Sequence, residues 1–246
     1  YTIDESLLLY IISYGLIAIL IGIYLFYYFK PKLEFDFKSL FSEISKKEMY
    51  RFSLFAFAGS LGSVFAFRID SLMIPKFISM EANGAFSIGV TLASALAVPA
   101  TGIFILYAPI ISNFIKNNQI SELDLKYKEI SKLLFFIGAL LYSCIFLGID
   151  NLFMLLPTHE SLTGSIPVIL ILGFNVLINM ATGFNGEIIT YSKYYKFNLI
   201  AIGLLIILNV SLNLLFIKVL NYGIEGVAVA SLISMIVFNL SKLLFI

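Results

Sequence analysis

The chain has 246 residues, of which 60% are hydrophobic and 13% charged, and its mean hydropathy is +0.99. A soluble domain of this size has too little interior to hide that much apolar surface. The cations flank apolar runs and form no separate basic domain, which argues against nucleic-acid binding. Cys144 and His159 are single residues of their types, which excludes an internal disulfide and a Cys–His metal site.

Seven apolar runs follow one another along the chain, each with about 20 or more residues, the length that a helix needs to cross roughly 30 Å of hydrocarbon. We therefore expect an all-α fold, a polytopic membrane helix bundle of about seven transmembrane helices, with the lipid bilayer as its first partner. The runs are residues 7–29, 52–77, 85–111, 133–156, 166–191, 199–219 and 224–245.

The Lys and Arg residues gather in every second gap between these runs. They fill the gaps after the first, third and fifth runs, and Lys242 lies near the end of the seventh. Only Lys76 and Lys218 lie near the other side, while Arg68 lies inside a run. By the positive-inside rule, we predict that the long gaps at 30–49 and 116–132 are cytoplasmic and that His159 lies on the opposite side.

The longest polar gap, residues 30–50, mixes Leu, Phe and Ile with Lys and Glu, as is typical of an amphipathic segment at a membrane interface. We expect it to join two lobes. Residues 121–124, SELD, resemble a capping box and predict a helix that continues into the fourth run. The chain starts with Tyr1 and stops inside an apolar run, so we expect a piece of a longer membrane protein.

Arg68 and Asp70 are charges inside the second run, where each costs roughly 2.5–3.5 kcal/mol at a helix centre. Two residues span about 200° around a helix, so these charges do not pair well with each other. One interpretation is a structural ion pair or a snorkelling side chain, and the other is a site in a polar cavity. Arg suits a phosphate because it donates two parallel hydrogen bonds. Asp70 is also a candidate for ion coupling or gating.

Two pairs of asparagines stand four residues apart on later runs, Asn175 with Asn179 and Asn209 with Asn213. Asparagines at this spacing can clamp neighbouring helices together, or they can line a cavity at the depth of Arg68. We take these four, together with Arg68 and Asp70, as candidate substrate-binding residues.

Glu187 lies near the cytoplasmic end of the fifth run. It is explained by snorkelling or a pair with Lys193, or else it is a gating or ion-coupling carboxylate. Pro99, Gly102 and Pro109 interrupt the third run, because proline removes a backbone bond and bends a helix. The bend is a static kink or a hinge that moves during transport.

The sequence carries no GxSxG, P-loop or HExxH motif and no Cys–His pair. We therefore expect no enzymatic activity, no cofactor and no metal. A membrane-embedded polysaccharide polymerase or ligase would carry large outer loops, and the outer gaps here are short. A purely structural anchor would not need intramembrane charges and aligned asparagines.

Four stretches resemble the Wzx-type polysaccharide flippases of the MOP exporter superfamily, and together they extend over almost the whole chain. Phe86 stands where a Tyr is commoner in that family, and Lys218 replaces the usual Pro. The stretches are residues 68–74 (RIDSLMI) with 84–88 (GAFSI), 109–112 (PIIS) with 121–127 (SELDLKY), 208–217 (LNVSLNLLFI), and 222–231 (YGIEGVAVAS).

The resemblance implies two six-helix lobes around a central cavity. Residues 1–29 would be the last helix of the first lobe, 30–50 a cytoplasmic linker and 51–246 the second lobe. It implies flipping of an isoprenoid-pyrophosphate-linked oligosaccharide across the bacterial inner membrane by alternating access, for surface polysaccharides such as O-antigen. The polysaccharide polymerase or chain-length machinery would be further partners. A lipid II or multidrug exporter of the same superfamily is the alternative.

Overall fold

The computed structural model describes residues 3–29, 46–155 and 162–246, which are helical apart from short connections. The chain divides into two compact units, Tyr1–Phe52 and Ser53–Ile246. The first unit contains α1 (Ile3–Phe29), a helix of 27 residues that includes the apolar stretch Ile12–Tyr28. Residues 30–45 of the expected linker, and the loop with His159, lie outside the described residues.

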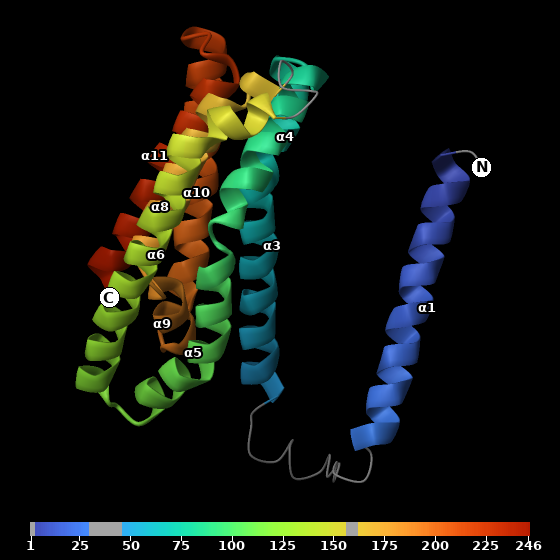
Figure 1. Ribbon diagram of the computed structural model, residues 1–246. Helices are drawn as coiled ribbons and strands as arrows, with labels where there is room; N and C mark the ends of the chain where they lie inside the picture. The colour runs from blue at the N-terminus through green and yellow to red at the C-terminus, as the bar shows by residue number, and fades with distance from the viewer. Residues whose placement is uncertain (1–2, 30–45, 156–161) are drawn as a thin grey trace. The chain divides into compact units, whose positions relative to one another are not determined.

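The second unit is a bundle in which successive crossings run in opposite directions (Figure 1). Its first helix, α3 (Lys46–Phe77), begins in the first unit. The remaining helices are α4 (Met80–Ala95), α5 (Val98–Lys116), α6 (Ile120–Met154), α8 (Ile166–Ala181), α9 (Asn185–Tyr191), α10 (Lys196–Leu214), the π-helix η2 (Leu215–Val219) and α11 (Gly223–Phe245).

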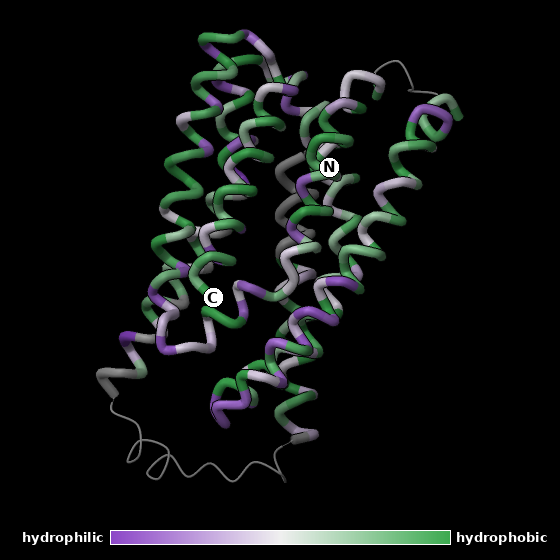
Figure 2. Tube along the Cα trace, turned by 90° about the vertical axis from the view of Figure 1, so that its left-hand side faces the viewer, coloured by the Kyte–Doolittle hydropathy of each residue, from purple (hydrophilic) through white to green (hydrophobic). Residues whose placement is uncertain are grey.

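Five helices of this bundle are long and apolar enough to cross a membrane, and α8 with α9 makes a sixth if the bent pair is one span. Figure 2 shows hydrophobic residues along most of the helix lengths and hydrophilic ones concentrated towards helix ends and connections. The predicted all-α membrane bundle is thereby confirmed, and the chain is a multi-pass membrane protein. The five spans are Met49–Phe77, Val98–Lys116, Ile120–Met154, Lys196–Val219 and Gly223–Phe245.

The third predicted run is not one continuous helix. It is divided into α4 and α5 at Leu96 and Ala97, and Figure 1 shows α5 continuing below α4. Pro99 stands in the first turn of α5, where its missing N–H leaves no helical bond unmade. Where we expected a bend within one helix, the structure has a break between two helices just before Pro99. Pro109 does lie inside α5.

The fifth predicted run is also broken, between α8 and α9, with a bend of 50°. Gly183 in the break has φ +59°, a left-handed conformation that favours glycine at the end of a helix. A Cβ at this position would also collide with the Ser131 side chain of α6. Tyr127 of α6 donates a hydrogen bond of 2.7 Å to the Thr182 carbonyl, so the break is held from one side by α6.

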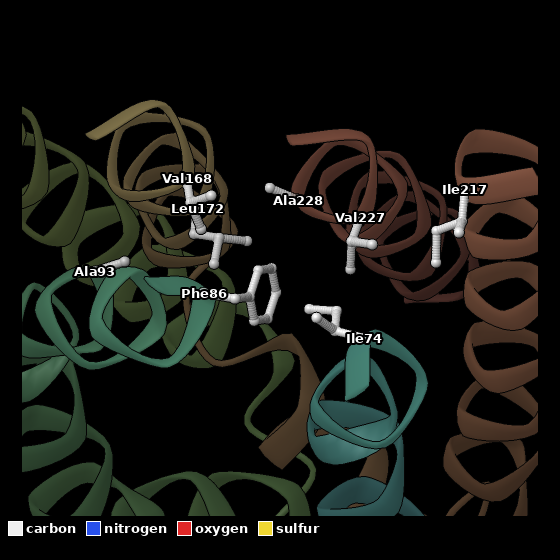
Figure 3. Packing of buried hydrophobic residues seen from close by; sticks show 8 residues of the cluster. All are labelled: Ile74, Phe86, Ala93, Val168, Leu172, Ile217, Val227 and Ala228. Carbon is white, nitrogen blue, oxygen red and sulfur yellow. The ribbon is translucent and has the colours of Figure 1, made fainter. Parts of the chain in front are cut away.

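Helix α8 packs against α4, α6 and α11. On the α4 side, Phe86 inserts its ring between α8 and α11, towards Leu172 and Val227 (Figure 3). The approach is close, because a Cβ at Gly89 of α4 would come 2.5 Å from Val168 of α8. Small residues permit such contacts between membrane helices. This packing fixes α8, which carries two of the candidate asparagines.

Helix α6 runs without interruption from the interface into the fourth span, as predicted. Its stripe Leu123, Ile130 and Leu134 is buried against α5 and α8. The predicted capping box is wrong, because the helix begins after Gln119 and no side chain caps it.

At the other end of α10 the chain forms the π-helix η2. The N–H of Leu220 donates to the carbonyl of Leu215, five residues earlier, at 3.1 Å. Ile217 of this turn is buried in the same cluster as Phe86.

We call the end of the bundle where α5 meets α6 and α9 meets α10 the lysine-rich end. These two connections lie at the same end in Figure 1, and α9 packs against α5. The cations at or beside them are Lys116, Lys126, Lys128, Lys193 and Lys196.

Candidate functional site

A cavity of about 410 Å³ lies among α3, α4, α8, α10 and α11 of the second unit. That volume is in the range of small-molecule sites, which are roughly 300–1,000 Å³. Much of its wall is apolar and belongs to two packed clusters, one around Phe86 and one containing Leu205 and Met235. The polar groups of the lining are Arg68, Asp70, Ser71, Ser94, Asn175, Asn179, Asn209 and Ser231.

Asp70 on α3 belongs to a closed ring of hydrogen bonds with Asn213, Asn209 and Ser231. Its Oδ1 accepts from Asn213 Nδ2 at 2.7 Å, and its Oδ2 accepts from Ser231 Oγ at 2.5 Å. Asn213 Nδ2 also donates to Asn209 Oδ1 at 2.7 Å. Asn209 Nδ2 completes the ring by donating to Ser231 Oγ at 3.1 Å. The ring ties α3 to α10 and α11.

The chemistry of this ring suits a buried carboxylate. Asp70 is 7% exposed, and a charge so placed needs hydrogen bonds in place of water. The donors are all neutral, so the ring leaves Asp70 without a direct cationic partner among the described residues. Asn213 is fully buried and is not among the lining residues, and its Oδ1 has no hydrogen-bond partner in the part of the chain that the structure describes. Carboxylate, amide and hydroxyl oxygens are thereby gathered at one point.

Arg68 also lines the cavity, although it stands two residues from Asp70 on the same helix. Asp70 is buried and Arg68 is exposed, so α3 directs the two charges differently, as the helical angle predicts. The direct ion pairs of the described residues are Lys126–Glu129 and Lys128–Asp124. The guanidinium of Arg68 is consequently available to a ligand.

Asn175 and Asn179 reach the same cavity from α8. The Oδ1 of Asn175 is buried with no hydrogen-bond partner among the described residues, which is uncommon for a buried polar atom. The Oδ1 of Asn179 accepts from Asn239 Nδ2 of α11 at 3.2 Å. One asparagine therefore clamps helices, and the other leaves an acceptor free at the cavity.

A second polar cluster lies next to the break between α8 and α9. Asn185 Nδ2 donates to Asn239 Oδ1 at 3.5 Å, a long and weak bond. Lys242 is 7% exposed, and its ammonium lies 4.0 Å from the centre of the Phe238 ring. Half-buried Glu187 interacts electrostatically with Lys242. Glu187 is thus apart from the cavity lining, next to Lys242 instead of the expected Lys193.

The structure gathers five of the six candidate binding residues on one cavity and joins the sixth, Asn213, to Asp70 by a hydrogen bond. The hinge candidates Gly102 and Pro109 are exposed on α5, away from the cavity lining.

Four site residues on α9 and α11 escape the sequence reasoning: Ser231, Asn239, Asn185 and Lys242. A signal was present on α11, since Ser231, Asn239 and Lys242 recur at helical spacing on a face that also carries Met235. No cluster of three His, Cys, Asp or Glu that could hold a metal occurs in the part of the chain that the structure describes.

No family model matches the chain, and no curated protein matches it. Several solved structures do match the chain. Three similar chains share 22% identity with this one over 80% of its length and 44% of theirs. They are a MOP superfamily transporter from Pyrococcus furiosus (TM-score 0.66), an outward-facing multidrug resistance MATE family transporter of the MOP superfamily (0.66), and a MATE protein in complex with MaL6 (0.67). The chain has part of a MOP transporter fold.

The chain spans 44% of the length of each of these MOP structures. The likeness concerns the fold, and it agrees with the superfamily resemblance of residues 222–231. In this MOP fold the polar cavity is built from residues of α3, α4, α8, α10 and α11.

Proposed function

We propose that the chain is part of an exporter that flips an isoprenoid-pyrophosphate-linked oligosaccharide across the bacterial inner membrane by alternating access. In this proposal residues 1–29 are the last helix of a first lobe, 30–50 a cytoplasmic linker and 51–246 the second lobe. The lysine-rich end faces the cytoplasm, by the positive-inside rule. The exported glycan serves surface polysaccharide such as O-antigen, together with a polymerase or chain-length machinery.

The observation that carries the proposal is the mixed lining of the cavity in a MOP fold. Arg68 is a cation without a described ion-pair partner, and a guanidinium holds a phosphate with two parallel hydrogen bonds. Side-chain amides both donate and accept, as sugar hydroxyls do. Asn175 and Asn179 line the cavity, although the Asn179 Oδ1 already accepts from Asn239, and Asn209 contributes to the lining while its amide is bonded within the Asp70 ring. The free Oδ1 of Asn175 supports the same interpretation.

Asp70 is our candidate for ion coupling. A buried carboxylate that is held by neutral donors changes its hydrogen bonds when it takes up a proton or a small cation. Because the ring joins α3, α10 and α11, such a change would alter how these helices pack. Glu187 is a gating carboxylate in this proposal, since it lies at the break between α8 and α9.

The test is binding of a polyprenyl-pyrophosphate-linked disaccharide to the purified chain in nanodiscs. Arg68→Ala should weaken binding by about 10- to 100-fold, the value of a charge-assisted hydrogen bond or two, and Arg68→Lys should fall between. Arg51→Ala is the matched control, because Arg51 is exposed on the same helix and is not a lining residue.

Equal affinity of the wild type and Arg68→Ala at equal folded protein would refute the assignment of Arg68. The MOP alternatives are resolved by competition. If lipid II or a cationic drug binds more tightly than the polyprenyl-pyrophosphate-linked disaccharide, then that ligand, and not the oligosaccharide, is the substrate.

A further inference from the structure

Lys242 occupies an unusual place for a lysine near the end of a membrane helix. Such side chains ordinarily extend to the interface, where the ammonium is hydrated. Lys242 instead is 7% exposed, with its Nζ 4.0 Å from the centre of the Phe238 ring one turn earlier on α11. A face of an aromatic ring attracts a cation but does not replace a counter-charge.

The space and the counter-charge for Lys242 both come from α9. A Cβ on Gly186 would lie 3.2 Å from the ammonium nitrogen, so glycine leaves the room that Lys242 fills. The next residue, Glu187, interacts electrostatically with Lys242 from the same short helix. The pair is not among the direct ion pairs of the described residues, so the two charges attract each other across a gap.

The same face of α11 reaches across the break in the fifth span. One turn before Lys242, Asn239 donates to Asn179 at the end of α8 and accepts from Asn185 at the start of α9. On the opposite side of the break, Tyr127 of α6 bonds the Thr182 carbonyl. Among the described residues, the polar interactions between α9 and α11 are thus one weak amide bond and one charge pair, while α9 also packs on α5 and Thr190 accepts from Asn198 of α10 at 2.8 Å.

We propose that Lys242 and Glu187 are positioning residues: their charge pair holds α9 against α11 and, through Asn239, keeps the amide of Asn179 aimed at the cavity. Asn239 has one amide partner on each side of the break, Asn179 on α8 and Asn185 on α9. If α9 moves away from α11, Asn239 loses Asn185 and is free to turn from Asn179. The cavity wall at Asn179 therefore depends on a charge that does not itself line the cavity.

Backbone hydrogen exchange of residues 185–191 in the nanodisc-embedded chain tests the proposal. Lys242→Met keeps the length and the contact with Phe238 but removes the charge, and it should speed exchange in α9 by about tenfold. Glu187→Gln should do the same. The exchanged pair Glu187→Lys with Lys242→Glu should return the rate towards that of the wild type. Lys193→Met is the matched control, since Lys193 is exposed at the same end, beside Tyr194.

Unchanged exchange in α9 in both single variants, or a swapped pair as fast as the singles, would overturn the proposal. If Lys242→Met does not accumulate in the membrane, the test rests on Glu187→Gln and on the swapped pair. A swapped pair that also fails to accumulate would count against the proposal.

A double-mutant cycle of ligand affinity tests whether the charge pair influences the cavity. This experiment rests on the proposed function. For the polyprenyl-pyrophosphate-linked disaccharide, the losses from Lys242→Met and Asn179→Ala should be less than additive. Additive losses would overturn the link to Asn179. Faster exchange with no binding of the probe, even by the wild type, would refute the proposed substrate and leave the charge pair standing.

Discussion

Asp70 and Lys242 are both buried charges in the second unit, and the bundle stabilises them in different ways. Asp70 is surrounded by neutral donors at 2.5 and 2.7 Å, arranged in a ring that spans three helices. Lys242 has an aromatic face and a carboxylate at a distance. Hydrogen bonds are directional and fail over a fraction of an ångström, whereas attraction between charges declines slowly with distance. We therefore expect the Asp70 region to be the more rigid one and the Lys242 region to tolerate more movement.

The largest effect should come from Asn213→Leu, which tests the rigid region. Leucine fills a similar volume but leaves the Asp70 carboxylate with one donor in a buried site. An uncompensated buried charge costs about 3–5 kcal/mol. We expect a strong loss of thermal stability in detergent.

The double variant Asp70→Leu with Asn213→Leu is the control for that experiment. Removing the charge together with its partner should recover much of the stability, because no ion is then stranded. A double variant less stable than Asn213→Leu would contradict the charged-ring account.

Gly183→Ala should have the next largest effect, because it strains the break on which the Lys242 region depends. The left-handed φ and the collision with Ser131 together cost about 1–3 kcal/mol. Thermal melting should show this loss. The control is Gly102→Ala on α5, where a Cβ meets no atom within 4 Å and the glycine lies in a helix. Equal melting temperatures for both variants would contradict a specific requirement at the break.

Lys242→Met should cost less than Asn213→Leu, about 1–2 kcal/mol. Methionine keeps the packing on Phe238, and the half-buried Glu187 that remains can be reached by water. This order is the sharpest test of the comparison between the two charges. A melting temperature lower for Lys242→Met than for Asn213→Leu would reverse the assignment of rigid and tolerant regions.

Lys128→Ala should have the smallest effect. Its ion pair with Asp124 is only 2.6 Å long, but both side chains are more than half exposed at the start of α6. Exposed pairs one helical turn apart contribute about 0.5 kcal/mol or less. Melting in low and high salt should show a slight difference at most. A loss as large as that of Lys242→Met would show that proximity, and not burial, decides the value of a charge here.

Helix positions could be predicted from the apolar runs, because the membrane requires long stretches that water-soluble helices lack. Hydropathy does not report backbone conformation, so the apolar runs alone could not place the two helix breaks, although Pro99 indicated a bend in the third run. Residues 181–186, ATGFNG, did contain glycine and asparagine, which favour such a break. A break at Leu96 and Ala97 has no such composition, and only Pro99 following it marks the new helix.

For the site, the spacing of Asn209 and Asn213 predicted a common face, but not that the face would meet Asp70. That contact joins residues 143 positions apart, so it depends on tertiary packing. Lys242 was missed because the positive-inside rule explains any lysine near a helix end. Only the packing of α9 distinguishes a buried lysine from an interfacial one.

The π-helix η2 has a consequence for chain length. A π-turn holds one residue more than an α-turn in the same place, here between Asn213 and the start of α11 at Gly223. Loss of one residue among 215–219 would convert the turn to ordinary α-helix without rotating Asn209 and Asn213 away from Asp70. Related chains one residue shorter at this point could therefore keep both charge sites in register, and the gap in an alignment belongs in this turn.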